Sequence, residues 1–79
     1  MYVYILKSDK DGSFYIGSAK DISKRVMQHN NGYSVSTKSK RPWVLVRVEE
    51  YSNNLLAIKR EKFLKTGRGR QVVSNICSC

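Results

Sequence analysis

Residues 14–30 constrain the fold most strongly, because a strand pattern there passes through a turn directly into an amphipathic helix. Residues 14–18 are rich in aromatic and β-branched types, which favours a strand. Asp21 is a good residue to begin a helix over residues 22–30, and Gly32 is placed to end it. The segment therefore predicts a strand–turn–helix unit around which the rest of the chain packs.

One face of the predicted helix carries Ile22, Val26 and His29, which recur at helical spacing. Arg25 lies just beside this face, and Gln28 is expected to point away from it. His29 should therefore face the sheet together with the apolar residues. A histidine in that position is either a core-edge residue that only satisfies its hydrogen bonds or a functional group.

The start of the chain predicts the partner of the strand at residues 14–18. Residues 2–7 have strand-forming types, and Asp11-Gly12 is a hairpin-turn signal between the two strands. Alternation along each strand then brings Tyr4 close to Gly17 and Tyr15 on one face. The register itself does not follow from the sequence.

The second half of the chain predicts a strand and two helices. Residues 43–51 are apolar on both faces at their centre, which suits a middle strand covered on both sides, and residues 33–42 before it predict a polar, basic loop. A helix over residues 54–65 follows a cap at Ser52 or Asn53. A short last helix is expected within residues 68–76. The inner face of the first of these helices should carry Leu56, Ala57, Arg60, Phe63 and Leu64.

These elements predict an α+β fold in the order β-β-α-β-α, with a short additional helix. The sheet is expected to be small, three-stranded and largely antiparallel, with helices packed on it. A chain of 79 residues is expected to be one domain, residues 1–79. Cys77 and Cys79 are too close for a good disulfide and are expected to form a reduced C-terminal tail.

The charge of the chain predicts a polyanionic partner. Fifteen Lys and Arg residues against six Asp and Glu residues give a formal net charge of +9. Nucleic acid is the first candidate, because neutralised phosphates release counterions. A membrane surface is less suitable, because it needs a basic amphipathic helix and these cations are spread over several elements. Without a predicted signal peptide or membrane span, the chain is expected in the cytoplasm.

Glu61 is notable for its surroundings in the sequence. Residues 51–79 contain six cations and this single acid. One interpretation is an i,i+4 ion pair with Lys65, worth about 0.3–0.5 kcal/mol. The other is that the carboxylate holds a divalent metal while the cations bind phosphates that the metal also contacts.

In this arrangement the sequence resembles the GIY-YIG nuclease family, and in particular its small, single-domain bacterial-type members. The resemblance covers about residues 2–70. The matching segments are Tyr2-Val3-Tyr4, Tyr15-Ile16-Gly17, Asp21-Ile22-Ser23-Lys24-Arg25 with His29-Asn30, Arg41-Pro42, and Arg60-Glu61-Lys62 with Leu64-Lys65-Thr66-Gly67.

The sequence departs from the family pattern in three respects. Tyr2 stands where the glycine that names the first motif is found, as it does in other small members. Asn75 is the only late asparagine, and the role of the asparagine in other branches is not carried over to it. The accessory DNA-binding domain of the repair and homing enzymes is missing from this sequence, which leaves target specificity open.

The resemblance implies a metal-dependent endonuclease that hydrolyses DNA phosphodiesters, with a role in DNA repair or processing. Glu61 would bind one Mg²⁺ or Mn²⁺ ion, and Arg25 would clamp the phosphate. Tyr4 and Tyr15 would activate the attacking water, which requires conditions that favour the phenolate. Gly17 would keep the sheet surface open to the nucleic acid. His29 would hydrogen-bond a tyrosine or assist the proton transfer. The cations expected to contact phosphates are Lys38, Lys40, Arg41, Arg68 and Arg70.

Two other functions fit parts of the sequence. A nucleic-acid-binding module with weak or lost catalysis explains the charge but not the isolated Glu61. A protein-interaction domain with an acidic partner would show little salt dependence in DNA binding. The expected partner is DNA, or RNA, without a small-molecule cofactor. Structural roles remain open for the individual site residues, for example Tyr4 and Tyr15 as a cross-strand packing pair.

Overall fold

An antiparallel hairpin begins the fold in the computed structural model, which describes residues 1–33 and 35–76. Strand β1 (Tyr2–Ser8) pairs with β2 (Phe14–Ala19), and the turn between them contains Gly12 at a φ of +77°. Such a φ is accessible to glycine at little cost. The register places Tyr4 opposite Gly17 and Leu6 opposite Tyr15. The predicted placement of both tyrosines on one face is therefore confirmed.

The third strand lies at an edge of the sheet. Strand β3 (Trp43–Glu50) pairs antiparallel with β1, so the strand order is β2-β1-β3. The prediction that this strand is the middle one is wrong. Its apolar run resembles a buried strand, but β1 carries apolar residues on both faces as well and takes the central position. The side chains left 38–48% exposed on β3 are Val44, Leu45, Val46 and Val48.

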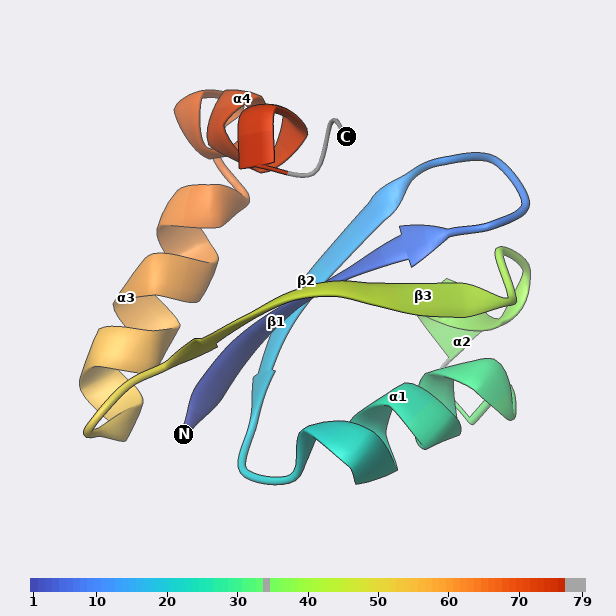
Figure 1. Ribbon diagram of the computed structural model, residues 1–79, viewed down its shortest axis with the longest axis horizontal. Coiled ribbons are helices and arrows are strands. Elements are labelled where there is room, and N and C mark those ends of the chain that lie inside the picture. The colour runs from blue at the N-terminus through green and yellow to red at the C-terminus, as the bar shows by residue number, and fades with distance from the viewer. Residues whose placement is uncertain (34, 77–79) are drawn as a thin grey trace.

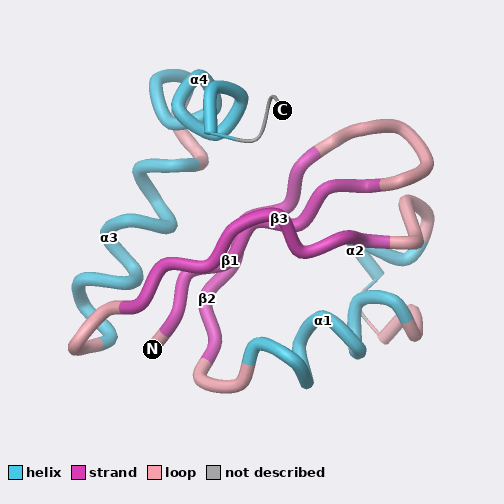
Figure 2. The backbone as a smooth tube through the Cα atoms, viewed as in Figure 1, coloured by secondary structure: helices cyan, strands magenta, loops and turns pink. Residues whose placement is uncertain are grey.

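Helices cover both faces of the sheet, which is strongly twisted (Figures 1 and 2). Helix α1 (Ile22–Asn30) and the one-turn helix α2 (Val35–Lys38) lie on one side. Helices α3 (Asn54–Leu64) and α4 (Gly67–Ile76) lie on the other. The predicted α+β class is confirmed. Helix α2 was not predicted, because its four polar and β-branched residues carry no helical periodicity.

Side-chain caps fix where the two long helices begin. The carboxylate of Asp21 accepts a hydrogen bond from the backbone N–H of Lys24 at 3.0 Å. The amide oxygen of Asn53 accepts one from the N–H of Leu56, also at 3.0 Å. Each cap satisfies an N–H group that has no partner within its own helix. The caps thus set how α1 and α3 leave the sheet.

Two separate clusters of buried side chains lie on opposite faces of β1. Tyr4, Leu6 and Trp43 form the cluster beneath α1. The cluster beneath α3 and α4 consists of Val3, Ile5, Ile16, Ala57, Leu64 and Val73. Strand β2 is an edge strand of the sheet and contributes to both clusters, Ile16 to one and the partly buried Tyr15 to the other.

The predicted inner face of α3 is only partly correct. Ala57 and Leu64 are fully buried, whereas Leu56 is 45% and Phe63 39% exposed. Arg60 reaches β3 instead of the core, and its Nε donates to Glu49 Oε1 at 2.9 Å. The narrower buried face follows from the three-stranded sheet, which is too small to cover a wide stripe of the helix.

The described residues contain no helix that is both long and apolar enough to cross a membrane. The expectation of a reduced tail at Cys77 and Cys79 concerns residues outside the described part of the chain.

Candidate active site

A buried hydrogen-bonded chain runs from β1 through α1 to α2. The hydroxyl of Tyr4 lies 3.1 Å from Nε2 of His29, and Nδ1 of the same ring lies 2.9 Å from Oγ1 of Thr37. All three residues are buried, with exposed fractions of at most 3%. The prediction that His29 faces the sheet is confirmed, and both of its ring nitrogens have a partner.

Tyr15 places a second phenol ring beside this chain but nearer to solvent. Its ring centroid lies 4.7 Å from that of His29 and 6.3 Å from that of Tyr4. Tyr15 also lines a cavity of about 250 Å³ together with Arg25, Gln28, His29 and Tyr33. Of the two tyrosines predicted as site residues, the cavity therefore gives a ligand access to Tyr15, together with the histidine, while Tyr4 lies beneath them.

Gly17 is required by Tyr4 rather than by an approaching ligand. A Cβ atom at residue 17 would lie 2.5 Å from the hydroxyl oxygen of Tyr4 and 2.6 Å from its Cζ. Both distances are well below van der Waals contact. We expected a glycine here because it would keep the sheet surface open to nucleic acid. The structure gives another reason for it, since the glycine makes room for the buried phenol of Tyr4.

Arg25 lies at the mouth of the cavity, where its guanidinium is exposed. Its Nη1 donates a hydrogen bond to Oε1 of Gln28 at 3.2 Å. The expectation that Gln28 points away is wrong, because its long side chain bends back along the helix to Arg25. A guanidinium held in this way can present its remaining N–H groups to an anion.

The electrostatics of the buried chain favour neutral groups. Burial raises the pKa of Tyr4, and the neighbouring Tyr15 adds to this, which outweighs the lowering by Arg25. Burial also lowers the pKa of His29, and the positive charge of Arg25 lowers it further. At neutral pH Tyr4 is therefore a phenol and His29 a neutral imidazole. Within the chain itself, Arg25 alone is not enough to favour a phenolate at Tyr4.

Glu61 approaches the same strand from the opposite face of the sheet. Ser18, which follows Gly17 in β2, donates to Oε1 of Glu61 at 2.7 Å, and Nζ of Lys65 donates to Oε2 at 2.8 Å. Burial alone would raise the pKa of Glu61, but the bonds from Lys65 and Ser18 lower it more. The carboxylate is thus ionised and fixed at the edge formed by β2.

The comparisons with known proteins agree with this geometry. Residues 1–72 match the family model described as the GIY-YIG catalytic domain. The chain belongs to the GIY-YIG family. Its family is one of nucleases, which supports a nuclease-like function.

Small UPF0213 proteins of staphylococci are among its relatives. The UPF0213 protein SSP2268 of Staphylococcus saprophyticus is 50% identical over 66 residues, which cover 82% of this chain and 79% of that protein. The UPF0213 protein SERP0126 of Staphylococcus epidermidis is 45% identical over 76 residues, or 95% and 92% of the two chains.

A solved structure shares the fold. The solution NMR structure of the UPF0213 protein BH0048 from Bacillus halodurans superimposes with a TM-score of 0.57 at 28% sequence identity. The similarity covers 95% of this chain and 82% of that one. The GIY-YIG fold is thus found over almost the whole chain rather than in one motif.

The donor set at Glu61 fits a divalent metal of the kind that the GIY-YIG resemblance implies. Among the described residues, no group of three or more His, Cys, Asp and Glu side chains gathers into a metal-binding cluster. A single carboxylate nevertheless suits Mg²⁺, which keeps several waters and is commonly bound by one or two carboxylates plus substrate phosphates. In this GIY-YIG chain Lys65 occupies one carboxylate oxygen, so a metal there would displace its ammonium group.

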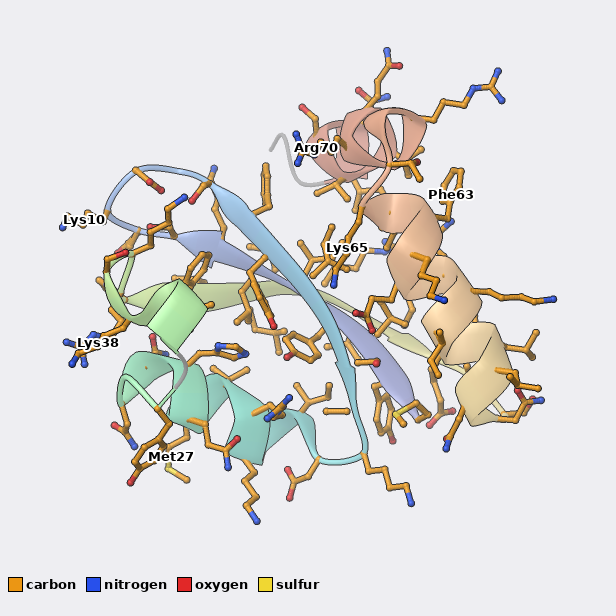
Figure 3. The ribbon with its side chains drawn as sticks, turned by 180° about the vertical axis from the view of Figure 1, so that it is seen from behind. Lys10, Met27, Lys38, Phe63, Lys65 and Arg70 are labelled. Carbon is orange, nitrogen blue, oxygen red and sulfur yellow. The ribbon has the colours of Figure 1, made fainter. Side chains whose placement is uncertain are left out.

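Four of the five cations predicted to contact phosphates line two cavities. Lys38 and Arg41 line an open cavity of about 470 Å³ together with Lys10 and Ser39. A second cavity of about 510 Å³ lies between β2 and α4, and its cationic lining residues are Lys40, Lys65 and Arg70. Figure 3 shows Lys10 and Lys38 at one edge of the view, and Lys65 and Arg70 nearer its middle. Arg68 is exposed on α4 and lines neither cavity.

Several residues at the GIY-YIG site were not predicted as site residues. Ser18 and Thr37 make contacts between elements that are distant in sequence, so no periodicity could reveal them. Lys65 was predicted only as an ion-pair partner, an interpretation that the observed distance to Glu61 confirms. Lys10 lies in the hairpin turn, whose position relative to α2 depends on the whole fold.

Proposed function

We propose that this chain is a metal-dependent endonuclease that hydrolyses phosphodiester bonds in DNA. The observation that carries the proposal is the convergence of two sets of groups on the β2 edge. Tyr15, Arg25 and His29 approach from the side of α1, and Glu61 approaches from the side of α3. A phosphodiester lying across β2 would meet a general base, a phosphate clamp and an anionic metal ligand together.

The hydrogen-bonded chain of Tyr4, His29 and Thr37 favours a mechanism in which Tyr4 passes a proton on to His29, instead of one in which Tyr4 is a phenolate before the substrate binds. The neutral imidazole of His29 can accept the phenol proton of Tyr4 at Nε2, over the observed 3.1 Å. The oxygen of Tyr4 would then take the proton of an attacking water that Tyr15 orients, and this water would have to pass from the cavity between the rings of Tyr15 and His29, which lie above Tyr4. In this mechanism His29 is the final base, and the raised pKa of Tyr4 is an advantage because its proton is shared and not lost.

The charged groups would stabilise the transition state. Arg25 would donate to the non-bridging phosphate oxygens, where negative charge increases during attack. A divalent ion bound at Glu61 would supply charge neutralisation at the phosphate and the leaving oxygen. Lys65, once displaced from Glu61, would lie within the same cationic cavity as Lys40 and Arg70 and could bind the neighbouring phosphate.

The test is cleavage of supercoiled plasmid, single-stranded DNA and a flap duplex in Mg²⁺, Mn²⁺ or EDTA. Glu61→Gln and Arg25→Ala should each reduce the rate by on the order of 10²-fold or more. Glu50→Gln is the matched control, because Glu50 lies on β3 at the other edge of the sheet and should cleave like the parent. Cleavage that persists in EDTA or in Glu61→Gln would refute the proposal.

The second candidate is a nucleic-acid-binding module with weak or lost catalysis. The salt bridge between Lys65 and Glu61 favours it, because the carboxylate already has a cationic partner within the chain. This function predicts salt-sensitive DNA binding with no cleavage on any of the three substrates, and equal binding by the parent and Glu61→Gln. The two candidates thus differ in the cleavage assay and not in the binding assay.

A further inference from the structure

Thr37 is a buried polar residue that the proposed mechanism does not use. Only 1% of its surface is exposed, and its Oγ1 lies 2.9 Å from Nδ1 of His29. It belongs to α2, in the segment that connects α1 to β3. A hydroxyl buried against a ring nitrogen can either donate to it or accept from it, and the choice decides which tautomer the neutral imidazole adopts.

The backbone around Thr37 is held firmly. Its carbonyl oxygen accepts a hydrogen bond from Nε1 of the buried Trp43 at 2.9 Å. The backbone of Trp43 is in turn bonded twice to the side chain of Asn30 in α1, at 2.6 and 3.0 Å. Thr37 is therefore tied to both α1 and β3, and its hydroxyl has a defined position relative to His29.

Donor and acceptor roles at Tyr4 determine the direction of the hydrogen bonds. Of the two hydroxyls that face the imidazole, the phenol of Tyr4 is the stronger donor and the weaker acceptor, because a lone pair of its oxygen is delocalised into the aromatic ring. The phenol proton is then directed at Nε2 of His29, 3.1 Å away. A neutral imidazole that accepts at Nε2 carries its proton on Nδ1, and the atom facing that proton is Oγ1 of Thr37.

We propose that Thr37 is a positioning residue, whose hydroxyl accepts the Nδ1–H of His29 and so keeps Nε2 unprotonated towards Tyr4. Holding this tautomer prepares His29 to receive the proton of Tyr4 before any substrate binds. The catalytic consequence rests on the proposed nuclease function, but the tautomer itself does not and can be measured without substrate.

The test uses the fact that His29 is the only histidine in the sequence, so its imidazole ¹⁵N signals need no assignment between residues. In the full-length protein the pyrrole-type nitrogen should be Nδ1. Thr37→Val, which removes the hydroxyl from a side chain of similar shape, should reduce the ratio of Nδ1–H to Nε2–H tautomer at least tenfold. Thr37→Ser, which keeps the hydroxyl, should retain the parent ratio.

Each outcome decides the inference. An Nε2–H tautomer in the parent protein, or an unchanged ratio in Thr37→Val, would overturn it. If Thr37→Val does not fold, Tyr4→Phe serves instead: it should keep the Nδ1–H tautomer, and a change there would show that Tyr4 and not Thr37 sets it.

Activity adds a separate readout. If the parent protein cleaves DNA, Thr37→Val should lower kcat about tenfold with KM unchanged, and Thr37→Ser should restore it. If the parent protein does not cleave but the tautomers behave as stated, the positioning role stands and the proposed function fails.

Discussion

At the scale of single residues, the hydroxyl of Tyr4 connects most of the site. It touches His29, it is the atom that excludes a side chain at residue 17, and its pKa responds to Arg25 and Tyr15. Because the ring is fully buried, it has no free space into which to move. Changes near this atom should therefore affect stability and chemistry together.

Gly17→Ala tests this coupling. The new methyl group would overlap the phenol of Tyr4, so we expect a loss of about 1–3 kcal/mol in the free energy of unfolding, measured with urea. Combining it with Tyr4→Phe removes the nearer of the two clashing atoms, so the double variant should lose less than the sum of the single losses. Full additivity would show that the methyl group is accommodated elsewhere.

The titration of His29 gives a second prediction at this scale. Because burial and then Arg25 lower its pKa, the ¹H or ¹⁵N midpoint of this single histidine should lie below 6.5. Protonation then opposes folding, so this group should make stability fall as pH drops below 6.5, where the unfolded chain binds the proton more readily. Cleavage should likewise decline on the acid side.

The matched variant for the titration is Arg25→Met, which keeps the length of the side chain without its charge. It should raise the His29 midpoint but leave it below 6.5, since burial is the larger cause. A midpoint at or above 6.5 in the parent protein would contradict the lowered pKa of His29. The proposed proton transfer from Tyr4 to His29 depends on that neutral imidazole.

At the scale of elements, the sequence predicted those parts of the site that follow from local periodicity. Alternation in the hairpin placed Tyr4 with Tyr15 and Gly17, and the helical repeat placed His29 towards the sheet. Contacts made only by tertiary packing, such as that of Thr37 with His29, could not be predicted. The edge position of β3 could not be predicted either. Both β1 and β3 have apolar residues on both faces, so the sequence pattern does not show which of them is the central strand.

The junction of α3 and α4 carries a prediction with an internal control. A Cβ at residue 69 would meet the carbonyl oxygen of Phe63 and the backbone of Leu64, so the two helices approach each other through this glycine. Because backbone atoms cannot yield as a side chain can, Gly69→Ala should lose at least about 2 kcal/mol of unfolding free energy. The loss should appear in thermal and urea denaturation.

Gly67→Ala is the control for this substitution. It lies two residues earlier, where a Cβ has nothing within 4 Å and the φ is not positive. Its effect should stay within about 0.5 kcal/mol, or be slightly stabilising because alanine favours a helix. Equal losses in both variants would mean that the close approach of α3 and α4 does not limit stability.

At the scale of the whole molecule, size and charge limit how DNA can be bound. The longest dimension is 29 Å, which corresponds to about eight base pairs at 3.4 Å each. A duplex of that length contacts one face of the molecule, whereas the fifteen cations are spread over several elements, so mainly those beside the site should contribute. One cationic cavity borders β2 and the other borders the hairpin turn and the end of α2, so both are places where phosphates near the bond to be cut could bind.

Salt dependence of binding separates local contacts from net charge. Each phosphate contact contributes about −0.9 to the slope of log K against log salt concentration for duplex DNA. Lys38→Gln, within the cavity that also contains Lys10 and Arg41, should make the slope shallower by about that amount. Lys59→Gln removes the same charge from an exposed position on α3 that lines neither cationic cavity, and its effect should be much smaller.

Fluorescence anisotropy in EDTA measures DNA binding by both variants without cleavage. Equal effects of the two variants would mean that DNA responds only to net charge, and a flat slope in the parent protein would favour an acidic protein partner over nucleic acid.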